Sequence, residues 1–582
     1  MNSYRERLFA ASEVLEAGAW RAELRNDEIA DISYRGVPVL RGIRAVVRDQ
    51  DWQTLAPVVR GIERIPATEG TSLLLDLEFD GFGCRYSGTL GIAFSADSLE
   101  VIFDGESPAD FQSNRIGLVV LHRPDDAGRE VLIGGNAGGQ TPSRFPVDIS
   151  PHQPFREIAS MSWRRDVVDF NLSFTGDVFE TEDQRNWTDA SFKTYSRPLA
   201  LPFPMDIPAG SRLHQSVRLT ASTGDSPTPE TTGVEDLVIT PEVASVVPAL
   251  SLPIVFISDV QSENKTLEGA ESLLVELVAG APGLAELAKH ASELAESLHL
   301  PLDVRLSTET PDEVAAILKL VPTRNIARLG VFHSTRHITE PDLWDGLKSA
   351  ADDAGLTASL VAGARSHFTE LNRNAHMVPA DAEALVYSIT PQMHATEIPH
   401  LVESLPMQRL TARNALRISG GRPLHVGPVT LKPRFNAVST TTATDETPDE
   451  APTDSLQTDE FAAAWVLGSI AALSIPGVQS LSYFEVAGPR GISSPTGLTP
   501  AGRILNSIAA LRGRSIFKTR GSRRGLVLYP VQSEDGIEIY AANLTAERMT
   551  ETVQLPDGNT KNLVLEPWTA THQHTPAERR SS

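Results

Sequence analysis

The chain has 582 residues, with 51 Lys and Arg against 75 Asp and Glu, which gives a formal net charge of −24. This length predicts about three or four domains, and 41% hydrophobic with 22% charged residues indicates a globular chain. The acidity argues against nucleic acid and anionic membranes as partners, because both are bound by clustered Lys and Arg. The single cysteine, Cys84, excludes an intrachain disulfide and a Cys-rich zinc site.

The first 220 residues alternate apolar and polar side chains. Leu73, Leu75 and Leu77 are separated by Leu74 and Asp76, and turn signals recur at short spacing. This pattern predicts an N-terminal antiparallel β-sandwich over residues 1–220. Residues 221–249 begin with a polar, Pro-rich stretch and are expected to form a linker.

Residues 250–513 alternate short apolar runs with helical patterns, as in a parallel sheet covered by helices. Thr310-Pro311-Asp312-Glu313, for example, combines an N-cap, a proline at the first helical position and a capping-box glutamate. The length favours a (β/α)8 TIM-like barrel, with an open sheet as the alternative. An eighth strand is not placed, and the seven predicted strands are 254–258, 302–306, 329–333, 358–362, 384–389, 424–431 and 481–486.

Three further segments complete the predicted organisation. Residues 439–455 are polar and are expected to form a loop inserted in the barrel. Alternation returns over residues 514–570 and predicts a small C-terminal β-domain, and residues 571–582 are expected to be a disordered tail. No signal-peptide core follows Met1, and no window approaches about 18 uninterrupted apolar residues, so the expected location is the cytoplasm.

A barrel carries its active site beyond the C-terminal ends of its strands. Glu370 follows the fourth predicted strand and Glu485 ends the seventh, so the two carboxylates could act as acid and base, or as acid and nucleophile. His394, after the fifth strand, could polarise a carbonyl or transfer a proton. The alternatives are a helix N-terminal charge for Glu370, a solvated carboxylate for Glu485 and a residue near a helix N-cap for His394.

No metal or cofactor is predicted. Five histidines follow different strands without a helical H-E-x-x-H pattern, although the sequence does not decide metal dependence. No G-x-S-x-G elbow and no Walker loop occurs. The histidines are His333, His337, His367, His394 and His425.

The most unusual segment is 179–195, which brings acids, amides, two cations and several aromatic residues together without apolar periodicity. Aromatic faces beside hydrogen-bonding groups suit a sugar-like polyol, so Arg185, Trp187, Asp189 and Lys193 are predicted to bind substrate. Asn372, beyond the fourth predicted strand, is assigned the same role. The alternative is a surface loop held by ion pairs of Arg185 and Lys193.

Residues 182–195 (EDQRNWTDASFKTY) resemble the D-apionate lactonase family of bacterial apiose catabolism. Further stretches with the same resemblance are 114–122, 149–155, 369–373 (TELNR) and 429–436 (VTLKPRFN). The resemblance implies a carboxylic-ester hydrolase that opens a sugar-acid lactone, with a small sugar lactone as its partner. A substrate that is uncharged until it is hydrolysed would tolerate the acidity of the chain.

Lactone opening needs an activated water, stabilisation of an oxyanion and protonation of the leaving oxygen. We therefore expect Glu370 and Glu485 to share the acid and base roles, with His394, Asn372 or Arg185 near the oxyanion. A glycoside hydrolase with two catalytic glutamates is the first alternative, and a non-catalytic carbohydrate-binding protein is the second.

Overall fold

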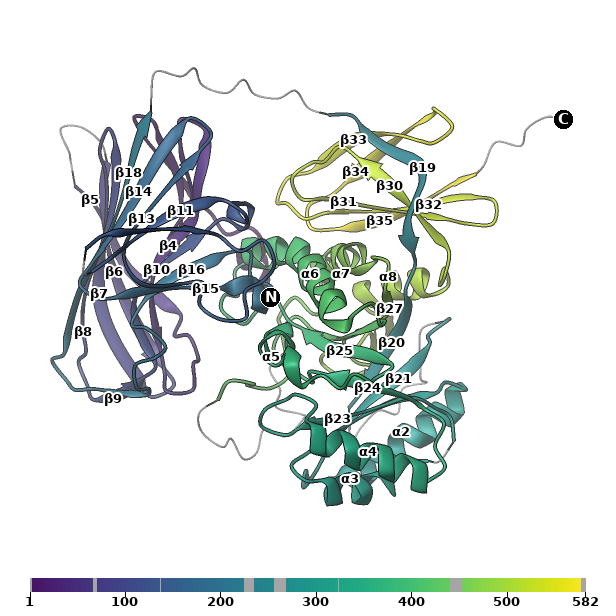
Figure 1. Cartoon of the computed structure of the whole chain (residues 1–582). Helices are drawn as coiled ribbons and strands as arrows, with labels where there is room; N and C mark the ends of the chain where they lie inside the picture. Colours follow the sequence, from purple (N-terminus) through teal and green to yellow (C-terminus); the bar gives the residue numbers. More distant parts are fainter. Residues whose placement is uncertain are drawn as a thin grey trace.

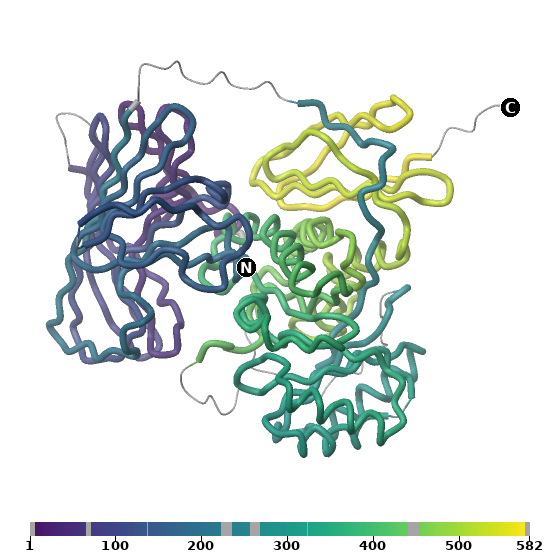
Figure 2. The backbone as a smooth tube through the Cα atoms, viewed as in Figure 1, coloured from purple at the N-terminus to yellow at the C-terminus, as the bar shows by residue number. Residues whose placement is uncertain are grey.

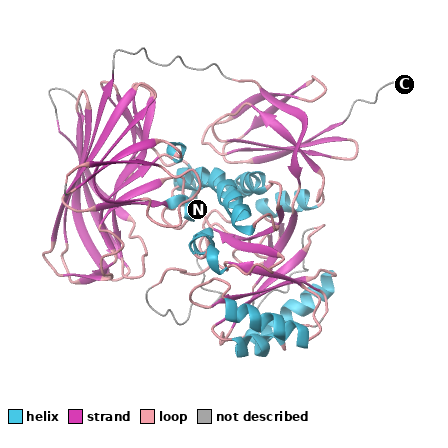
Figure 3. Cartoon of the chain, in the orientation of Figure 1, coloured by secondary structure: helices cyan, strands magenta, loops and turns pink. Residues whose placement is uncertain are grey.

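The computed structural model describes residues 3–65, 71–136, 138–223, 235–255, 268–322, 324–439 and 453–576. The chain forms an N-terminal β domain, a barrel and a C-terminal sheet (Figure 1). Helices surround the barrel, whereas the other two domains consist mainly of strands (Figure 3).

The N-terminal domain begins with helix α1 (Ser3–Leu8) and contains the short 3-10 helices η1 (Pro124–Asp126) and η2 (Gln184–Trp187). Its strands are β1 (Glu13–Ala17), β2 (Trp20–Arg25), β3 (Glu28–Tyr34), β4 (Val37–Arg48), β5 (Pro57–Ile65), β6 (Thr71–Gly81), β7 (Cys84–Phe94), β8 (Ser98–Glu106), β9 (Phe111–Ser113), β10 (Arg115–His122), β11 (Glu130–Gly135), β12 (Gln140–Arg144), β13 (Phe155–Arg165), β14 (Val168–Thr175), β15 (Phe179–Asp183), β16 (Phe192–Ser196), β17 (Met205–Ile207) and β18 (Arg212–Thr223).

Most of these strands join one continuous sheet with the order β1-β2-β3-β4-β10-β16-β15-β13-β14-β18-β8-β7-β6-β5. The sheet folds over on itself, because Tyr34 of β3 and Phe170 of β14 are far apart in this order but their ring centroids lie 6.5 Å apart. Alternate side chains from both halves fill one apolar core. Two layers around one core correspond to the expected sandwich.

The central domain is a closed barrel of eight parallel strands, which confirms the TIM-like prediction. Its strands are β20 (Ala249–Ile254), β21 (Ser272–Val278), β22 (Leu302–Thr308), β23 (Ile326–His333), β24 (Ser359–Gly363), β25 (Ala384–Ile389), β26 (Leu424–Val429) and β27 (Val478–Tyr483). Around them lie α2 (Leu284–Leu298), α3 (Pro311–Leu318), α4 (Pro341–Asp353), α5 (Phe368–Arg373), η3 (Ala375–Met377), α6 (Ile398–Ser419), α7 (Glu460–Leu473) and α8 (Pro500–Ala509), with the small hairpin β28 (Ser493–Ser494) and β29 (Gly497–Leu498).

Two strands differ from the sequence prediction. The strand that could not be placed is β21, the second of the barrel, in which Glu276 interrupts an apolar run. The first strand covers Ala249–Ile254 rather than 254–258, and residues 256–258 lie outside the described chain. Glu370 and Glu485 therefore follow the fifth and eighth strands of the barrel.

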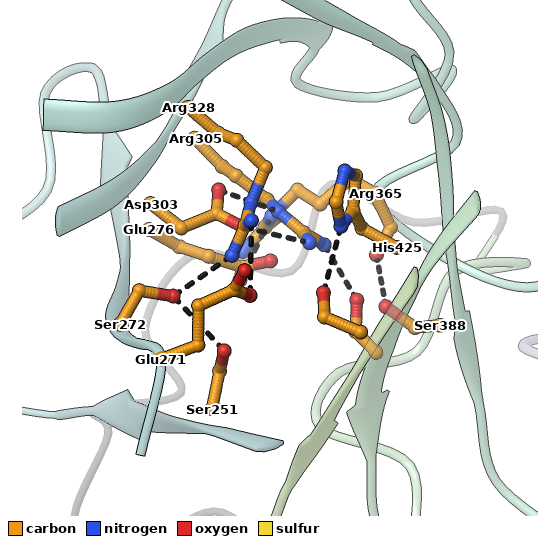
Figure 4. Close-up of polar contacts among 12 residues, drawn as sticks. Ser251, Glu271, Ser272, Glu276, Asp303, Arg305, Arg328, Arg365, Ser388 and His425 are labelled. Atoms are coloured by element: carbon orange, nitrogen blue, oxygen red, sulfur yellow. Dashed lines mark hydrogen bonds and ion pairs between the residues drawn. The ribbon is translucent and has the colours of Figure 1, made fainter. Parts of the chain in front are cut away.

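The barrel interior holds a network of buried ion pairs, which explains why a strand with a central charge can occur there (Figure 4). Asp303 of β22 pairs with Arg328 of β23 at 2.8 Å, and Arg328 also donates to Ser272 Oγ at 2.8 Å. Glu276 accepts from Arg365 at 3.2 Å and pairs with Arg434. Opposite charges compensate one another here, so the apolar periodicity of these strands is incomplete.

The C-terminal sheet has the order β34-β33-β19-β30-β31-β32-β35 and packs against the barrel helices α6 to α8 (Figure 1). Its strands are β19 (Leu237–Val246), β30 (Ser515–Arg520), β31 (Leu526–Gln532), β32 (Gly536–Asn543), β33 (Met549–Gln554), β34 (Thr560–Leu565) and β35 (Ala570–Pro576). Part of the expected linker therefore forms β19, which pairs with β30, and part of the expected tail forms β35, which pairs with β32. Residues 224–234, 440–452 and 577–582, where a linker, a loop and a tail were expected, lie outside the described chain.

The N-terminal domain docks against the barrel beside α5 and α6 (Figure 2). Asn372 Nδ2 of α5 donates to Ile149 O at 3.1 Å and to Asn186 Oδ1 at 2.9 Å. Arg44 of β4 forms an ion pair with Glu397 at 3.1 Å. These contacts fix the sandwich over one side of the barrel's C-terminal loops. In the described part of the chain, no helix has the length and apolarity needed to cross a membrane.

Candidate active site

A cavity of about 710 Å³ lies where the sandwich meets the barrel loops that follow β25 and β26. Its position agrees with the rule that barrel enzymes act at the C-terminal ends of their strands. The volume is in the range of small-molecule sites. Lining residues from the sandwich include Arg44, Arg48, Trp52, Arg115, Glu182, Trp187, Lys193 and Tyr195, and those from the barrel include Arg373, Gln392, His394, Phe435 and Asn436.

The unusual segment 179–195 forms the sandwich side of this cavity. It folds as β15, η2 and β16, and Asp183 starts η2 because its side chain accepts a hydrogen bond from Arg185 N. Thr188 ends the turn in the left-handed conformation, with a φ of 66°. Trp187, at the end of η2, and Lys193, on β16, are two of the predicted substrate-binding residues, and both line the cavity.

His394 and Asp189 form a buried pair at the cavity. His394 Nδ1 lies 2.7 Å from Asp189 Oδ2, and the pair joins the loop after β25 to the sandwich. An ionised carboxylate only accepts hydrogen bonds, so Nδ1 carries the proton and Nε2 presents a lone pair. Burial lowers the pKa of His394, while the Asp189 carboxylate raises it and the Lys193 ammonium lowers it. The imidazole is therefore neutral at neutral pH and suited to accept a proton.

A second buried group surrounds Glu182. Lys193 Nζ lies 2.6 Å from its carboxylate, Trp187 Nε1 donates to it at 3.1 Å, and Arg373 lies 3.7 Å away. Although burial opposes ionisation, the charges of Lys193 and Arg373 hold the pKa of Glu182 well below its usual range. Burial lowers the pKa of Lys193 to about 8, and the neighbouring Arg48 and Arg115 also lower it. This ammonium can therefore release a proton near neutral pH.

Trp187 provides an aromatic wall between two histidines. Its ring lies 5.7 Å from His394 at 89° and 5.5 Å from His367. Trp187 is 6% exposed, so neighbouring protein fixes its ring and only a small part of the residue faces the cavity. That part can contact the C–H groups of a sugar.

Three of the predicted substrate-binding residues, Arg185, Asp189 and Asn372, do not line the cavity. Asp189 contacts it only through His394, and the other two hold the fold. Arg185 is 1% exposed, forms a bidentate ion pair with Asp183 at 2.7 Å and donates to Pro146 O at 2.9 Å. The Asn372 side-chain amide donates hydrogen bonds to Ile149 O and Asn186 Oδ1 across the domain interface. Both therefore position the segment around the cavity without contributing a polar atom to its lining.

The two predicted glutamates are engaged outside the lining of this cavity. Glu370 is the capping-box residue of α5, accepting from Ser366 Oγ at 2.7 Å and from His367 N at 2.9 Å. Glu485 accepts from Arg490 Nε at 2.5 Å. Burial raises the pKa of both carboxyls. No hydrogen bond joins the two glutamates in the described structure, and their role as an acid–base pair stays a prediction.

Residues from β4 and β10 also reach the cavity and were not selected from the sequence. Arg48 is the last residue of β4 and Arg115 is the first residue of β10. Both line the cavity, which forms only when the domains are packed together and therefore could not be seen in the sequence pattern. Arg115 belongs to one of the stretches that resemble the family, which was the available signal. No group of three or more His, Cys, Asp or Glu able to hold a metal occurs among the described residues.

Comparison with known proteins links this site to one family. The model of the D-apionate lactonase N-terminal domain matches residues 2–224, and the model of the D-apionate lactonase TIM barrel domain matches residues 269–513. A D-apionate lactonase from Brucella anthropi is 27% identical over 583 aligned positions, covering 93% of each chain.

Solved structures are more distant. A β-arabinopyranosidase is 12% identical, covers 96% of this chain and 99% of its own, and has a TM-score of 0.30. A glycoside hydrolase family 30 xylanase from Clostridium acetobutylicum is 11% identical, covers 59% and 100%, and has a TM-score of 0.39. These scores support no conclusion about chemistry. The two matching domain models together span most of the sequence, and the chain belongs to the D-apionate lactonase family.

Proposed function

We propose that this protein is a hydrolase that opens a sugar-acid lactone in the cavity between the sandwich and the barrel. The observation that carries the proposal is the buried His394–Asp189 pair, which presents a neutral imidazole to a cavity that also contains Lys193. Family membership supports lactone hydrolysis, and the Brucella anthropi relative favours a lactone of the D-apionate type. A role in apiose catabolism would follow from that substrate.

His394 acts as the general base in this mechanism. Its Nε2 takes a proton from water as the water oxygen attacks the lactone carbonyl carbon. Asp189 holds the ring through Nδ1–H and stabilises the imidazolium that forms. No hydrogen bond within the described residues engages Nε2, so a water can occupy that position.

Lys193 acts as the general acid. The tetrahedral intermediate collapses when the bond between the carbonyl carbon and the ring oxygen breaks, and the leaving oxygen needs a proton. An ammonium with a pKa of about 8 is protonated at neutral pH but can donate readily. His394 then returns the water-derived proton to Lys193 through solvent. The new carboxylic acid ionises, so one proton is released for each lactone opened.

Substrate recognition follows from the lining. Trp187 contributes aromatic surface to the lining, and the amides of Gln392 and Asn436 also line the cavity, where they are held by Asp454 and by Asp51 O. The cavity volume of about 710 Å³ accommodates a five- or six-carbon sugar lactone with water.

A pH-stat assay on a panel of aldonolactones, including D-apionolactone, tests the proposal. We expect proton release with at least one aldonolactone, unaffected by a chelator, and its loss in His394→Asn. Undiminished hydrolysis by His394→Asn would contradict the role of the dyad. Hydrolysis of aryl glycosides without any lactone turnover would contradict the proposed reaction.

A further inference from the structure

Two arginines face each other directly in the cavity. Arg48 and Arg115 are paired in register on the adjacent antiparallel strands β4 and β10. They are 8% and 5% exposed, and both line the cavity. Like charges directly opposite each other on neighbouring strands destabilise a sheet, and burial increases that cost.

Neither guanidinium has a carboxylate partner among the described residues. The Nε atoms of Arg48 and Arg115 are buried without a hydrogen-bond acceptor in the structure. Their neighbours are aromatic: Arg115 lies 3.6 Å from the ring centroid of Tyr195, and both arginines lie within 6.0 Å of Trp52. Burial and, to a smaller extent, the charge of Arg115 together lower the pKa of Arg48 to about 10.

The other cations of the cavity are compensated. Arg44 pairs with Asp27 at 3.1 Å, and Lys193 pairs with Glu182 at 2.6 Å. Only the pair on β4 and β10 lacks an anion in the described part of the lining. A planar guanidinium binds a carboxylate through two parallel N–H groups, and two guanidiniums can share one carboxylate.

We propose that Arg48 and Arg115 form a subsite for a carboxylate group of the bound sugar acid. This inference rests on the proposed function, because it places the charged group of substrate or product in the same cavity. The carboxylate could be the one formed by ring opening, or a second carboxylate already present on the lactone of a sugar diacid. In both cases the ligand supplies the anion that the two buried guanidiniums lack.

Calorimetric titration of the full chain tests the subsite without requiring turnover. The probes are gluconate, its neutral counterpart glucitol and the diacid glucarate. We expect gluconate to bind about 10- to 100-fold more tightly than glucitol, as charge-assisted hydrogen bonds to a buried anion predict. Equal affinity for gluconate and glucitol would overturn the subsite even if lactones are hydrolysed. Selective gluconate binding without lactone turnover would uphold the subsite and contradict the proposed reaction.

Substitution of Arg48 separates ligand binding from support of the fold. Arg48→Met removes an uncompensated buried charge, so we expect the preference for gluconate to be lost while the thermal midpoint without ligand is unchanged or higher. Arg48→Lys should retain part of the preference. A purely structural arginine would instead lower the midpoint and weaken gluconate and glucitol binding alike, which would overturn the proposal.

Arg165 provides the matched control. It is also buried, but it is paired with Asp126 at 2.9 Å. Arg165→Met should lower the thermal midpoint and leave the gluconate preference unchanged. If Arg48→Met does not fold, Arg115→Met and the wild-type contrast between gluconate and glucitol decide the question.

The source of the carboxylate is decided by two kinetic measurements. If ring opening supplies it, gluconolactone is hydrolysed and gluconate inhibits competitively. If the substrate carries it permanently, kcat/KM for a glucarolactone exceeds that for gluconolactone by about 10-fold or more. Both results support the subsite. The subsite proposal is wrong if kcat/KM is the same for a glucarolactone and for gluconolactone and if gluconate does not inhibit.

Discussion

Replacement of Asp189 by asparagine tests the dyad most directly. The carboxylate lies 2.7 Å from His394 Nδ1 with little solvent contact, so it both fixes the tautomer and stabilises the imidazolium formed during water activation. An asparagine amide can present its N–H to Nδ1 and favour the wrong tautomer. For a buried dyad we expect kcat/KM to fall about 100- to 10,000-fold, which corresponds to about 3–5 kcal/mol of transition-state stabilisation.

The pH profile adds an independent measurement to this prediction. Activity requires neutral His394, whose pKa lies below its usual value, so the acid limb of the wild-type profile should lie below about pH 6.5. Because Asp189 raises the pKa of His394, the acid limb should move to lower pH in Asp189→Asn. A purely structural role for Asp189 would leave the limb in place.

A matched pair on the surface provides the control. His214 Nδ1 lies 2.5 Å from Asp104, but both side chains are exposed and lie outside the cavity. Asp104→Asn should therefore retain wild-type kinetics in the pH-stat assay. If Asp189→Asn keeps more than a third of the wild-type kcat/KM, the proposed catalytic role of the His394–Asp189 dyad is wrong.

Five other substitutions extend these expectations. Lys193→Met should lower the rate and abolish the alkaline limb expected near pH 8, whereas Arg48→Met should move that limb to higher pH, since Arg48 lowers the pKa of Lys193. Glu370→Gln and Glu485→Gln should each lower lactone hydrolysis less than about 10-fold if they act through a helix cap and an ion pair; losses above about 100-fold in both would establish them as the acid–base pair instead. His122 is fully buried with a pKa of about 3, so its unfolded state binds more protons and stability falls as pH decreases from about 6.5 toward 3. His122→Gln should reduce this acid-induced loss by about 2 kcal/mol at pH 5, measured by denaturant unfolding, and an unchanged pH dependence would contradict the account.

The sequence pattern predicts those parts of the fold in which burial follows chain periodicity. Alternation identifies the sandwich strands, and continuous apolar runs such as β25 identify the barrel. Strand β21 was missed because Glu276 interrupts its run, and its charge is compensated by Arg365 and Arg434 from distant positions. Strand β19 was missed because its partners are distant in sequence: Val246 pairs with Ser515 of β30, and Leu237 pairs with Val553 of β33.

In the candidate site, too, residues with a local sequence signal could be predicted, whereas residues whose role depends on distant partners could not. Trp187 and Lys193 could be selected because an unusual polar and aromatic composition is visible within one short segment. The structural roles of Arg185 and Asn372 could not be predicted from the sequence. Arg185 donates to a backbone oxygen of Pro146, and Asn372 donates to Asn186 of the other domain, which lies close only after the domains dock. The proposed anion subsite needs Arg48 and Arg115 together, and they lie opposite each other only because of the register in which β4 pairs with β10.

The net charge of −24 therefore does not determine the charge of the ligand. Exposed charges more than about 8 Å away are screened at physiological ionic strength, whereas buried charges interact through a medium of lower dielectric constant. Among the described residues that line the cavity, the uncompensated charges are those of Arg48 and Arg115. A carboxylate there is attracted locally, although the protein as a whole is acidic. The acidity of the sequence favours a neutral lactone as substrate, and the proposed subsite adds a place for the carboxylate that ring opening forms or that a sugar diacid carries.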